Sequence, residues 1–304
     1  MSWFGRWRRR QPQAATELRP NAGIFRFAGG RRHIAGVPYA LPKDDAEINR
    51  LDFQHYMLRY ALRGNYLAPI GQPRDILDVG SGSGRWTQEM ALAFPHANVV
   101  GLDLLPPPAD EATGDAGAGA RPPNYVFVTG NVLERVPFAD ASFDYTHQRL
   151  LFAAIPRPRW PQVASELARV TRPHGWVELV EGSVGSRANS PAEQRFTQWA
   201  LAVTARRDID LQIGAHLPAF LRDAGLTNVT VRELSIPIGA HGGRLGRMMQ
   251  ADVLAVIQGL RGPILATGIA DAATFDATIN QWLAEVDQYR SSWLIYVAIG
   301  QRPA

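Results

Sequence analysis

The 304-residue sequence has no cysteine, no long apolar run and only a modest net charge of +4. The absence of cysteine excludes disulfides, thiolate metal sites and cysteine nucleophiles, and it fits a cytoplasmic protein. No uninterrupted apolar stretch approaches the ~18–20 residues that cross a bilayer, so we expect no integral membrane segment. No metal site is expected either.

Arginine and tryptophan gather at the start of the chain, where Trp3, Phe4 and Trp7 alternate with four arginines. Such a cluster can touch an anionic membrane or nucleic acid, but Gln11-Pro12-Gln13 follows without amphipathic continuation, which favours a solvated tail. We therefore expect residues 1–40 to form an irregular arm. Residues 41–304 are expected to form a single domain, and a hydrophobic content of 46% supports a sizeable core.

The most informative pattern is a glycine turn between two apolar runs. The run Ile76–Val79 contains Asp78 and leads into Gly80-Ser81-Gly82-Ser83-Gly84, and a helix-like segment follows. A second apolar run, 99–102, ends at Asp103. Strand, glycine turn, helix, strand and acid form the layout of a nucleoside-binding α/β half-sheet, in which the acid accepts hydrogen bonds from ribose hydroxyls.

The glycine spacing separates two classes of cofactor. A dinucleotide site requires G-x-G-x-x-G, whereas this chain has glycine at 80, 82 and 84 and arginine at 85. With Asp78 two residues before the first glycine, the pattern resembles motif I of the class I S-adenosylmethionine (SAM) dependent methyltransferases. That resemblance implies a Rossmann-like α/β fold and SAM as the cofactor.

Segments outside motif I narrow the resemblance to one branch. Asp52-x-Gln54-His55, the run 147–151 and the run from Glu166 to Leu179 resemble the LaeA-like branch of small-molecule methyltransferases. The resemblance is good over residues 37–185 and holds only in outline beyond them. The cofactor-binding residues that it implies are Asp78, Gly80, Ser81, Gly82, Gly84, Asp103, Leu104, Asn131, Val132, Gln148, Tyr39 and Gln54.

Several of these residues have specific expected roles. Gly80 to Gly84 would pass under SAM, Asp103 would hold the ribose, and Leu104, Asn131 and Val132 would meet the adenine. His147 and Gln148 follow at the carboxyl end of a strand, where ligands bind in open α/β sheets. His147 is the candidate catalytic residue, with a hydrogen-bonded rim histidine as the alternative. Arg149 should pair with a carboxylate, either of a neighbouring side chain or of the cofactor. Glu181 should face the acceptor or cap the loop that follows it.

The pattern of elements predicts a seven-stranded, mostly parallel sheet with an antiparallel edge strand. The cofactor-binding core should span about residues 70–185. A helix is expected over 43–67, capped by Asp44 or Asp45. The resemblance implies that Tyr39, Gln54 and His55 belong to an N-terminal lid that closes over SAM, with an ordinary packed helix as the alternative. A helical cap over about residues 240–290 should cover the substrate site, because the stretch between the last two strands exceeds an ordinary crossover.

The leading functional hypothesis is a SAM-dependent methyltransferase that acts on an oxygen or nitrogen of a small molecule. The alternative is a SAM-binding regulator with little or no catalysis that works through protein partners. A nucleic-acid or protein substrate is supported only by the arginine-rich start, and no Asn-Pro-Pro-Tyr-type motif is present to hold a flipped base. We therefore do not expect a nucleic-acid partner, and the oligomeric state stays open.

Overall fold

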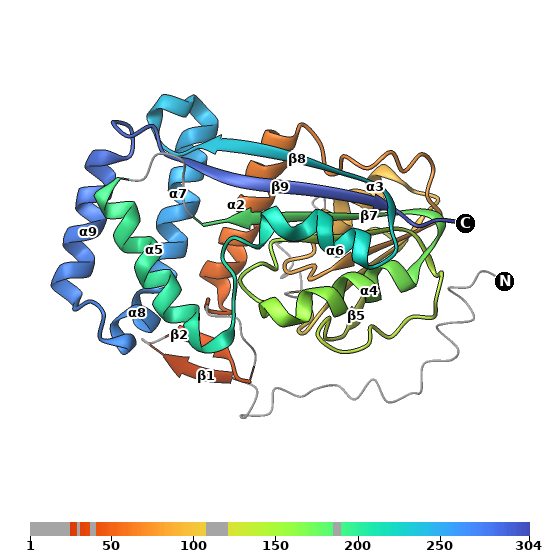
Figure 1. The fold of residues 1–304 in the computed structure, drawn as a ribbon, viewed down its shortest axis with the longest axis horizontal. Coiled ribbons are helices and arrows are strands. Elements are labelled where there is room, and N and C mark those ends of the chain that lie inside the picture. Colours follow the sequence, from red (N-terminus) through yellow and green to blue (C-terminus); the bar gives the residue numbers. More distant parts are fainter. Residues whose placement is uncertain (1–24, 29–30, 37–40, 108–120, 185–189) are drawn as a thin grey trace.

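The computed structural model describes residues 25–28, 31–36, 41–107, 121–184 and 190–304. Its centre is a seven-stranded sheet with the order β5-β4-β3-β6-β7-β9-β8 (Figure 1). The strands are β3 (Asp75–Val79), β4 (Asn98–Asp103), β5 (Tyr125–Thr129), β6 (Phe143–Arg149), β7 (Thr171–Ser183), β8 (Thr227–Pro237) and β9 (Ser292–Gln301).

Antiparallel pairing is confined to one end of this sheet. Strands β3 to β7 pair in parallel, whereas β9 runs antiparallel to both β7 and β8, with β8 outermost. The predicted seven-stranded, mostly parallel sheet is confirmed. Because parallel strands end at one edge, the loops after β3, β4, β6 and β7 come together there.

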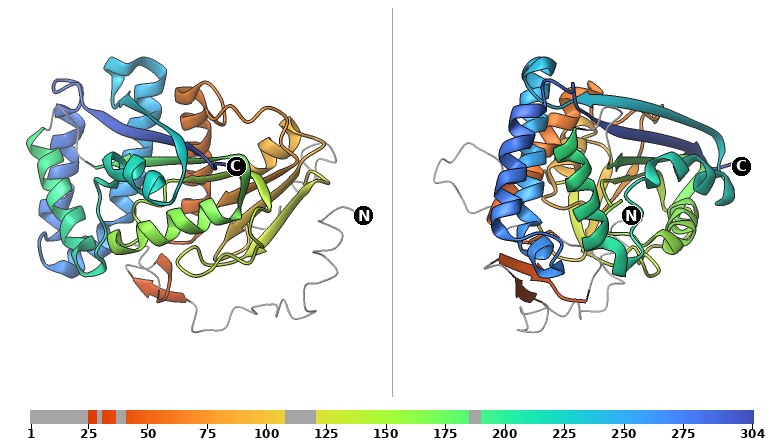
Figure 2. Two further views of the ribbon diagram at one scale, coloured as in Figure 1. Left: turned by 45° about the vertical axis from the view of Figure 1, so that its right-hand side comes forward. Right: turned by 60° about the vertical axis from the view of Figure 1, so that its left-hand side comes forward.

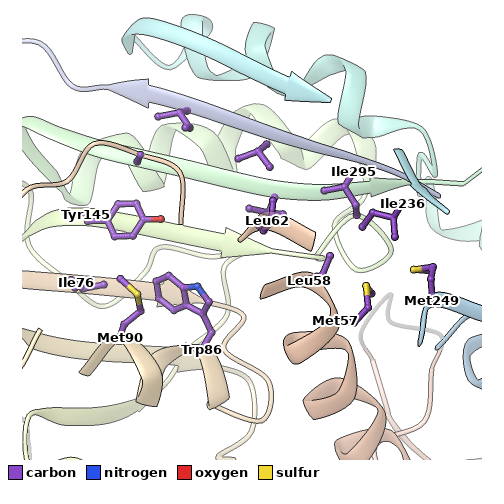
Figure 3. Packing of buried hydrophobic residues seen from close by; sticks show 14 of the residues in the cluster. Met57, Leu58, Leu62, Ile76, Trp86, Met90, Tyr145, Ile236, Met249 and Ile295 are labelled. Carbon is purple, nitrogen blue, oxygen red and sulfur yellow. The ribbon is translucent and has the colours of Figure 1, made fainter. Parts of the chain in front are cut away.

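Helices cover both faces of the sheet, which explains why its central strands are apolar on both sides. Helices α4 (Trp160–Val170) and α6 (Leu217–Asp223) lie on one face, and α2 (Asp45–Leu62) and α3 (Arg85–Ala93) lie on the other. Figure 3 shows the second layer, where Trp86 of α3 lies beside the sheet residues Ile76 and Tyr145. Met57 and Leu58 of α2 lie nearer to Ile236 and Ile295, toward the antiparallel end of the sheet. These layers hold the loop between β3 and α3 in a fixed place.

The helical cap predicted between the last two strands is present. Helices α7 (Gly243–Gly259), α8 (Arg261–Thr267) and α9 (Ala272–Glu285) connect β8 to β9, and α5 (Pro191–Thr204) packs against α8 and α9. Figures 1 and 2 show these helices standing together beyond one end of the sheet. Within the described ranges, no helix combines the length and the apolarity needed to cross a bilayer.

The N-terminal region departs from the expectation of an irregular arm. Strands β1 (Phe25–Ala28) and β2 (Arg31–Ile34) pair antiparallel below the cap (Figure 1). Arg31 of β2 forms an ion pair with Asp44, 2.6 Å between nitrogen and oxygen, and Asp44 also caps α2 by accepting from the amide of Glu47. This pairing ties the two strands to the start of α2. The prediction for residues 1–40 is therefore wrong over 25–28 and 31–34, and residues 1–24 lie outside the described ranges.

Candidate functional site

The glycine turn after β3 has the backbone conformation that its composition predicts. Gly80, Gly82 and Gly84 have φ of 73°, 57° and 78°, in the left-handed region that favours glycine. A Cβ atom at Gly80 would lie 2.7 Å from the side chain of Leu151. The amides of Gly80 and Ser81 donate to the carbonyl of Leu102 at the end of β4, at 2.7 and 3.1 Å. The turn is thus fixed to the neighbouring strand and presents bare backbone.

Asp103 ends β4 beside this turn. Its Oδ2 accepts from the amide of Gly82 at 2.8 Å, and its Oδ1 accepts from the amide of Leu104 at 2.7 Å. The amide of Leu105 also lies 3.5 Å from Oδ1, so Oδ2 is the oxygen that keeps a further lone pair for a ligand hydroxyl. Asp103 and Leu104 both line the cavity described below, as the sequence predicts for a ribose-binding acid and its neighbour.

Asp78 is held from two sides by the protein. Its Oδ2 accepts from the hydroxyl of Thr87 at 2.6 Å, and its Oδ1 lies 2.9 Å from Nδ1 of His147. The His147 ring stacks on the indole of Trp86, with 3.8 Å between centroids and 5° between planes, and the residue is 1% exposed. His147 does not line the cavity. The expectation that it meets a ligand directly is not supported, because burial between β6 and α3 makes it a support for Asp78.

Gln148 points to the opposite face of β6 and also lies outside the cavity lining. Its Nε2 donates to Oε1 of Glu181 at 3.1 Å, and Oε2 of Glu181 accepts from the amide of Phe152 at 2.9 Å. Burial raises the pKa of Glu181 to about 7. Glu181 thus holds the loop after β6, a different loop from the one after its own strand that it was expected to cap, and Gln148 does not reach the cavity.

The predicted adenine-edge residues lie just after β5. Asn131 accepts from the amide of Leu133 at 3.0 Å and donates to Glu134 at 3.2 Å, so its side chain closes its own turn. Neither Asn131 nor Val132 lines the cavity. Gly84, also outside the lining, is the cap residue before α3. Tyr39 lies outside the described residues.

A cavity of about 380 Å³ opens at the carboxyl edge of the parallel strands. One part is walled by Asp78, Gly80 to Ser83, Asp103 and Leu104, and by Leu51 and Gln54 of α2. The other part lies under the cap and is mostly apolar, with Phe196 and Val203 of α5, Val253 and Ile257 of α7 and Ile264 of α8 in its wall. We name these two parts the glycine-loop half and the cap half. The volume falls in the range of small-molecule sites, roughly 300–1,000 Å³.

A buried polar cluster joins the lid helix to the cap at this cavity. Arg50 donates to both carboxylate oxygens of Glu47 at 2.7 and 2.8 Å and to Oδ1 of Asp252 at 2.9 Å. Gln54 donates to Oδ2 of Asp252 at 2.9 Å, and burial raises the pKa of Asp252. Gln54 was predicted from the sequence, whereas Arg50, Glu47 and Asp252 were not, because 202 positions separate Arg50 from Asp252.

Arg149, the last residue of β6, lines the cavity without the neighbouring carboxylate that was expected. Its guanidinium donates to Nδ1 of His55 at 3.2 Å, and Nε2 of His55 lies 3.2 Å from Glu89. Burial and the charge of Arg149 lower the pKa of His55 to about 4. A neutral imidazole therefore separates the arginine from Glu89.

The donor set of the glycine-loop half fits an adenosyl amino acid. Asp103 has a lone pair on Oδ2 for a ribose hydroxyl, Leu104 supplies an apolar surface beside it, and the bare backbone of Gly80 to Gly82 leaves room for close approach. Among the described residues, no group of three or more His, Asp or Glu is placed to hold a metal ion.

Comparisons with known proteins agree with this geometry. A family model described as a methyltransferase domain matches residues 76–175. The methyltransferase str2 of Strobilurus tenacellus is 32% identical over 210 residues, which cover 66% of this chain and 72% of that protein. The N-methyltransferase sirN of Leptosphaeria maculans is 28% identical over 278 residues, covering 88% of this chain and 95% of that protein.

A solved structure gives the same fold at lower identity. Phosphoethanolamine N-methyltransferase 2 of Haemonchus contortus, in complex with S-adenosyl-L-methionine, superposes with a TM-score of 0.51 at 16% identity. The match covers 84% of this chain and 52% of that chain. At this identity the likeness concerns the fold alone.

Proposed function

This chain belongs to the SAM-dependent methyltransferases, and we propose that it methylates an oxygen or nitrogen atom of a small-molecule acceptor. The observation that carries the proposal is the two-part cavity, in which the glycine-loop half continues into an apolar half under the cap. When bound, SAM would supply a methyl group on a positively charged sulfur. An acceptor atom would attack the methyl carbon in line with the carbon–sulfur bond, and S-adenosylhomocysteine would be the leaving group. The protein must therefore hold two molecules close together and aligned.

The glycine-loop half is proposed to hold the cofactor. Asp103 would accept hydrogen bonds from the ribose of SAM, and Leu104 would lie beside its adenine. The backbone of Gly80 to Gly82 would line the middle of the cofactor. Asp78 would act by fixing the start of the turn, with His147 as its support. A role for Asn131 and Val132 at the adenine edge stays a proposal, as does membership of the LaeA-like branch.

The cap half is proposed to hold the acceptor. Its apolar side chains from α5, α7 and α8 exclude water from the reacting atoms and favour an acceptor with a substantial apolar surface. Relatives named N-methyltransferases, such as the one from Leptosphaeria maculans, support nitrogen as the acceptor atom. No general base is assigned, since one is needed only where the acceptor loses a proton during attack. We propose the cytoplasm as the site of action, which fits a chain without cysteine.

The first test is calorimetric titration of the protein with SAM and with S-adenosylhomocysteine. We expect micromolar binding of both, and a loss of binding in Asp103→Ala with the fold retained by circular dichroism. Retained affinity in that variant would overturn the assignment of the ribose site. Absence of binding in the unaltered protein would overturn the proposed function.

The second test is release of S-adenosylhomocysteine with a panel of small phenols, amines and amides, followed by mass spectrometry. A mass gain of one methyl group on any of them establishes catalysis. Tight SAM binding without turnover across the panel would favour the regulatory alternative.

A further inference from the structure

Arg149 lies at the carboxyl edge of the sheet, on the side of the glycine loop opposite to Asp103. Strand β3 lies between β4 and β6, and Val79 pairs with Gln148, so Arg149 comes level with Gly80. Asp103 ends β4 on the other side of the glycine loop. The two residues are therefore separated by two strand spacings, roughly 10 Å, with the glycine loop between them.

Other arginines of the cavity wall are neutralised by carboxylates. Arg50 is held by Glu47 and Asp252, and Arg85 donates to Asp52 at 2.8 Å. Within the part of the chain that the structure describes, no carboxylate lies within 4 Å of the Arg149 guanidinium, and its hydrogen-bond partner there is His55. Burial lowers the pKa of Arg149, and the more distant charges of Asp78, Glu89 and Glu181 offset this effect only in part.

The contact with His55 fixes this cation without neutralising it. An arginine can only donate, so Nδ1 of His55 must be the acceptor and the ring proton lies on Nε2, toward Glu89. Glu89 is in turn held by Arg59 and Asn65, at 2.6 and 2.9 Å. A guanidinium has five N–H donors, and the contact with His55 uses one of them. A positioned, desolvated guanidinium in a cavity wall is suited to bind an anion.

We propose that Arg149 binds the carboxylate at the amino-acid end of the cofactor, and that His55 and Glu89 are the positioning residues that aim it. The inference rests on the proposed function, because it names a contact within that same cofactor site. The ribose and the carboxylate would then be held at opposite sides of the glycine loop, by Asp103 and Arg149. A carboxylate on the acceptor would offer the same chemistry, and the experiment separates the two sources by omitting any acceptor.

The experiment measures binding of three ligands by calorimetry: SAM, decarboxylated SAM and 5′-methylthioadenosine, which lacks the amino-acid portion. The unaltered protein should bind SAM about 10- to 100-fold more tightly than decarboxylated SAM, the range for a charge-assisted hydrogen bond. In Arg149→Met this preference should disappear, because affinity for SAM falls while affinity for the other two ligands is unchanged. Arg149→Lys should restore part of it.

Arg85→Met is the matched control, since it removes another arginine of the same wall that already has a carboxylate partner. It should leave the preference for SAM over decarboxylated SAM intact. The proposal is overturned if Arg149→Met weakens all three ligands equally, which indicates a structural role, or if it leaves SAM affinity unchanged, which points to an acceptor carboxylate. If the unaltered protein binds SAM and decarboxylated SAM equally, this inference alone fails. If it binds none of the three, the proposed function fails with it.

Discussion

The Nδ1 atom of His147 lies 2.9 Å from Oδ1 of Asp78, across the parallel pair β3 and β6. This contact joins the middle of the sheet to the residue that precedes the glycine loop by two positions. Because the ring also stacks on Trp86 of α3, one buried side chain connects β6, β3 and α3. The geometry of the loop therefore depends on a histidine that does not reach the cavity.

His147→Phe tests this dependence. The substitution keeps an aromatic ring against Trp86 but removes the hydrogen bond to Asp78, whose buried carboxylate then retains Thr87. We expect the free energy of unfolding to fall by about 1–3 kcal/mol and affinity for S-adenosylhomocysteine to fall about tenfold. Urea denaturation and calorimetry measure the two effects. Unchanged binding together with a collapse of methyl transfer would instead restore the catalytic role predicted from the sequence.

Gly82→Ala tests whether the bare backbone of the loop matters for binding rather than only for folding. Gly71→Ala is its control, because both glycines have nearly the same left-handed φ, 57° and 58°, and neither has a close neighbour where a Cβ would be added. Each variant should lose about 1–2 kcal/mol of stability from the strained conformation. Only Gly82→Ala should weaken S-adenosylhomocysteine binding. Equal binding in the two variants would contradict the placement of the cofactor on this loop.

The cluster of Arg50, Glu47 and Asp252 predicts an asymmetry between two substitutions. Asp252→Ala leaves Arg50 paired with Glu47, so we expect a loss of about 1–3 kcal/mol in the free energy of unfolding. Arg50→Met leaves two buried carboxylates without their cation and should cost more, about 3–5 kcal/mol. The double variant should be more stable than the sum of the two losses implies, because Arg50 and Asp252 contact each other. Urea denaturation of the three variants checks this order, and equal losses in the single variants would refute it.

Glu181 should make the protein less stable as the pH rises through the weakly acidic range. Its pKa is raised from 4.5 to about 7 by burial, so the folded state retains a proton that the unfolded state releases above about pH 4.5. Stability is therefore lost between about pH 4.5 and 7, by an amount on the order of 3 kcal/mol. Glu181→Gln should remove this slope when the free energy of unfolding is measured across that range.

Glu166→Gln is the control for the pH experiment. Arg169 lowers the pKa of Glu166, so its contribution is present above pH 4.5 and is lost only at lower pH. Between pH 5 and 7 the difference between Glu166→Gln and the unaltered protein should therefore be constant. A constant difference for Glu181→Gln as well would contradict the pKa assigned to Glu181.

Local sequence patterns sufficed to place the glycine loop, and to place Asp103 at the end of the second strand of the parallel sheet, because each depends on residues within one or two elements. The succession of strand and helix patterns sufficed for a seven-stranded, mostly parallel sheet. They also located the cap, since the interval between the last two strands is too long for a simple crossover. They left two roles open for His147, because alternation along β6 places Tyr145 and His147 on one face without showing that α3 would cover it. Proximity to the end of a strand predicted ligand contacts for His147 and Gln148, yet among these neighbours it is Arg149 that lines the cavity.

Contacts between residues far apart in the chain could not be predicted from local sequence patterns. Asp252 is one acid among several polar residues of α7, and only the packing of α7 on α2 brings it to Arg50 and Gln54. The same is true of His55, whose neighbours Glu89 and Arg149 come from a helix and a strand that follow it in the chain. Such side chains are identified by tertiary structure rather than by spacing.

The position of α7 and α8 between β8 and β9 separates two kinds of sequence change. These helices line the cap half of the cavity. In the sequence, however, they lie in the connection between β8 and β9, at the antiparallel end of the sheet, far from the loop that follows β3. Replacing apolar residues there would alter the shape of the proposed acceptor site and would leave Gly80 to Gly84 and Asp103 unchanged. Under the proposed function, acceptor selection and cofactor binding are therefore encoded in separate stretches of the chain, and Asp252 joins the two through its contacts with Arg50 and Gln54 of α2.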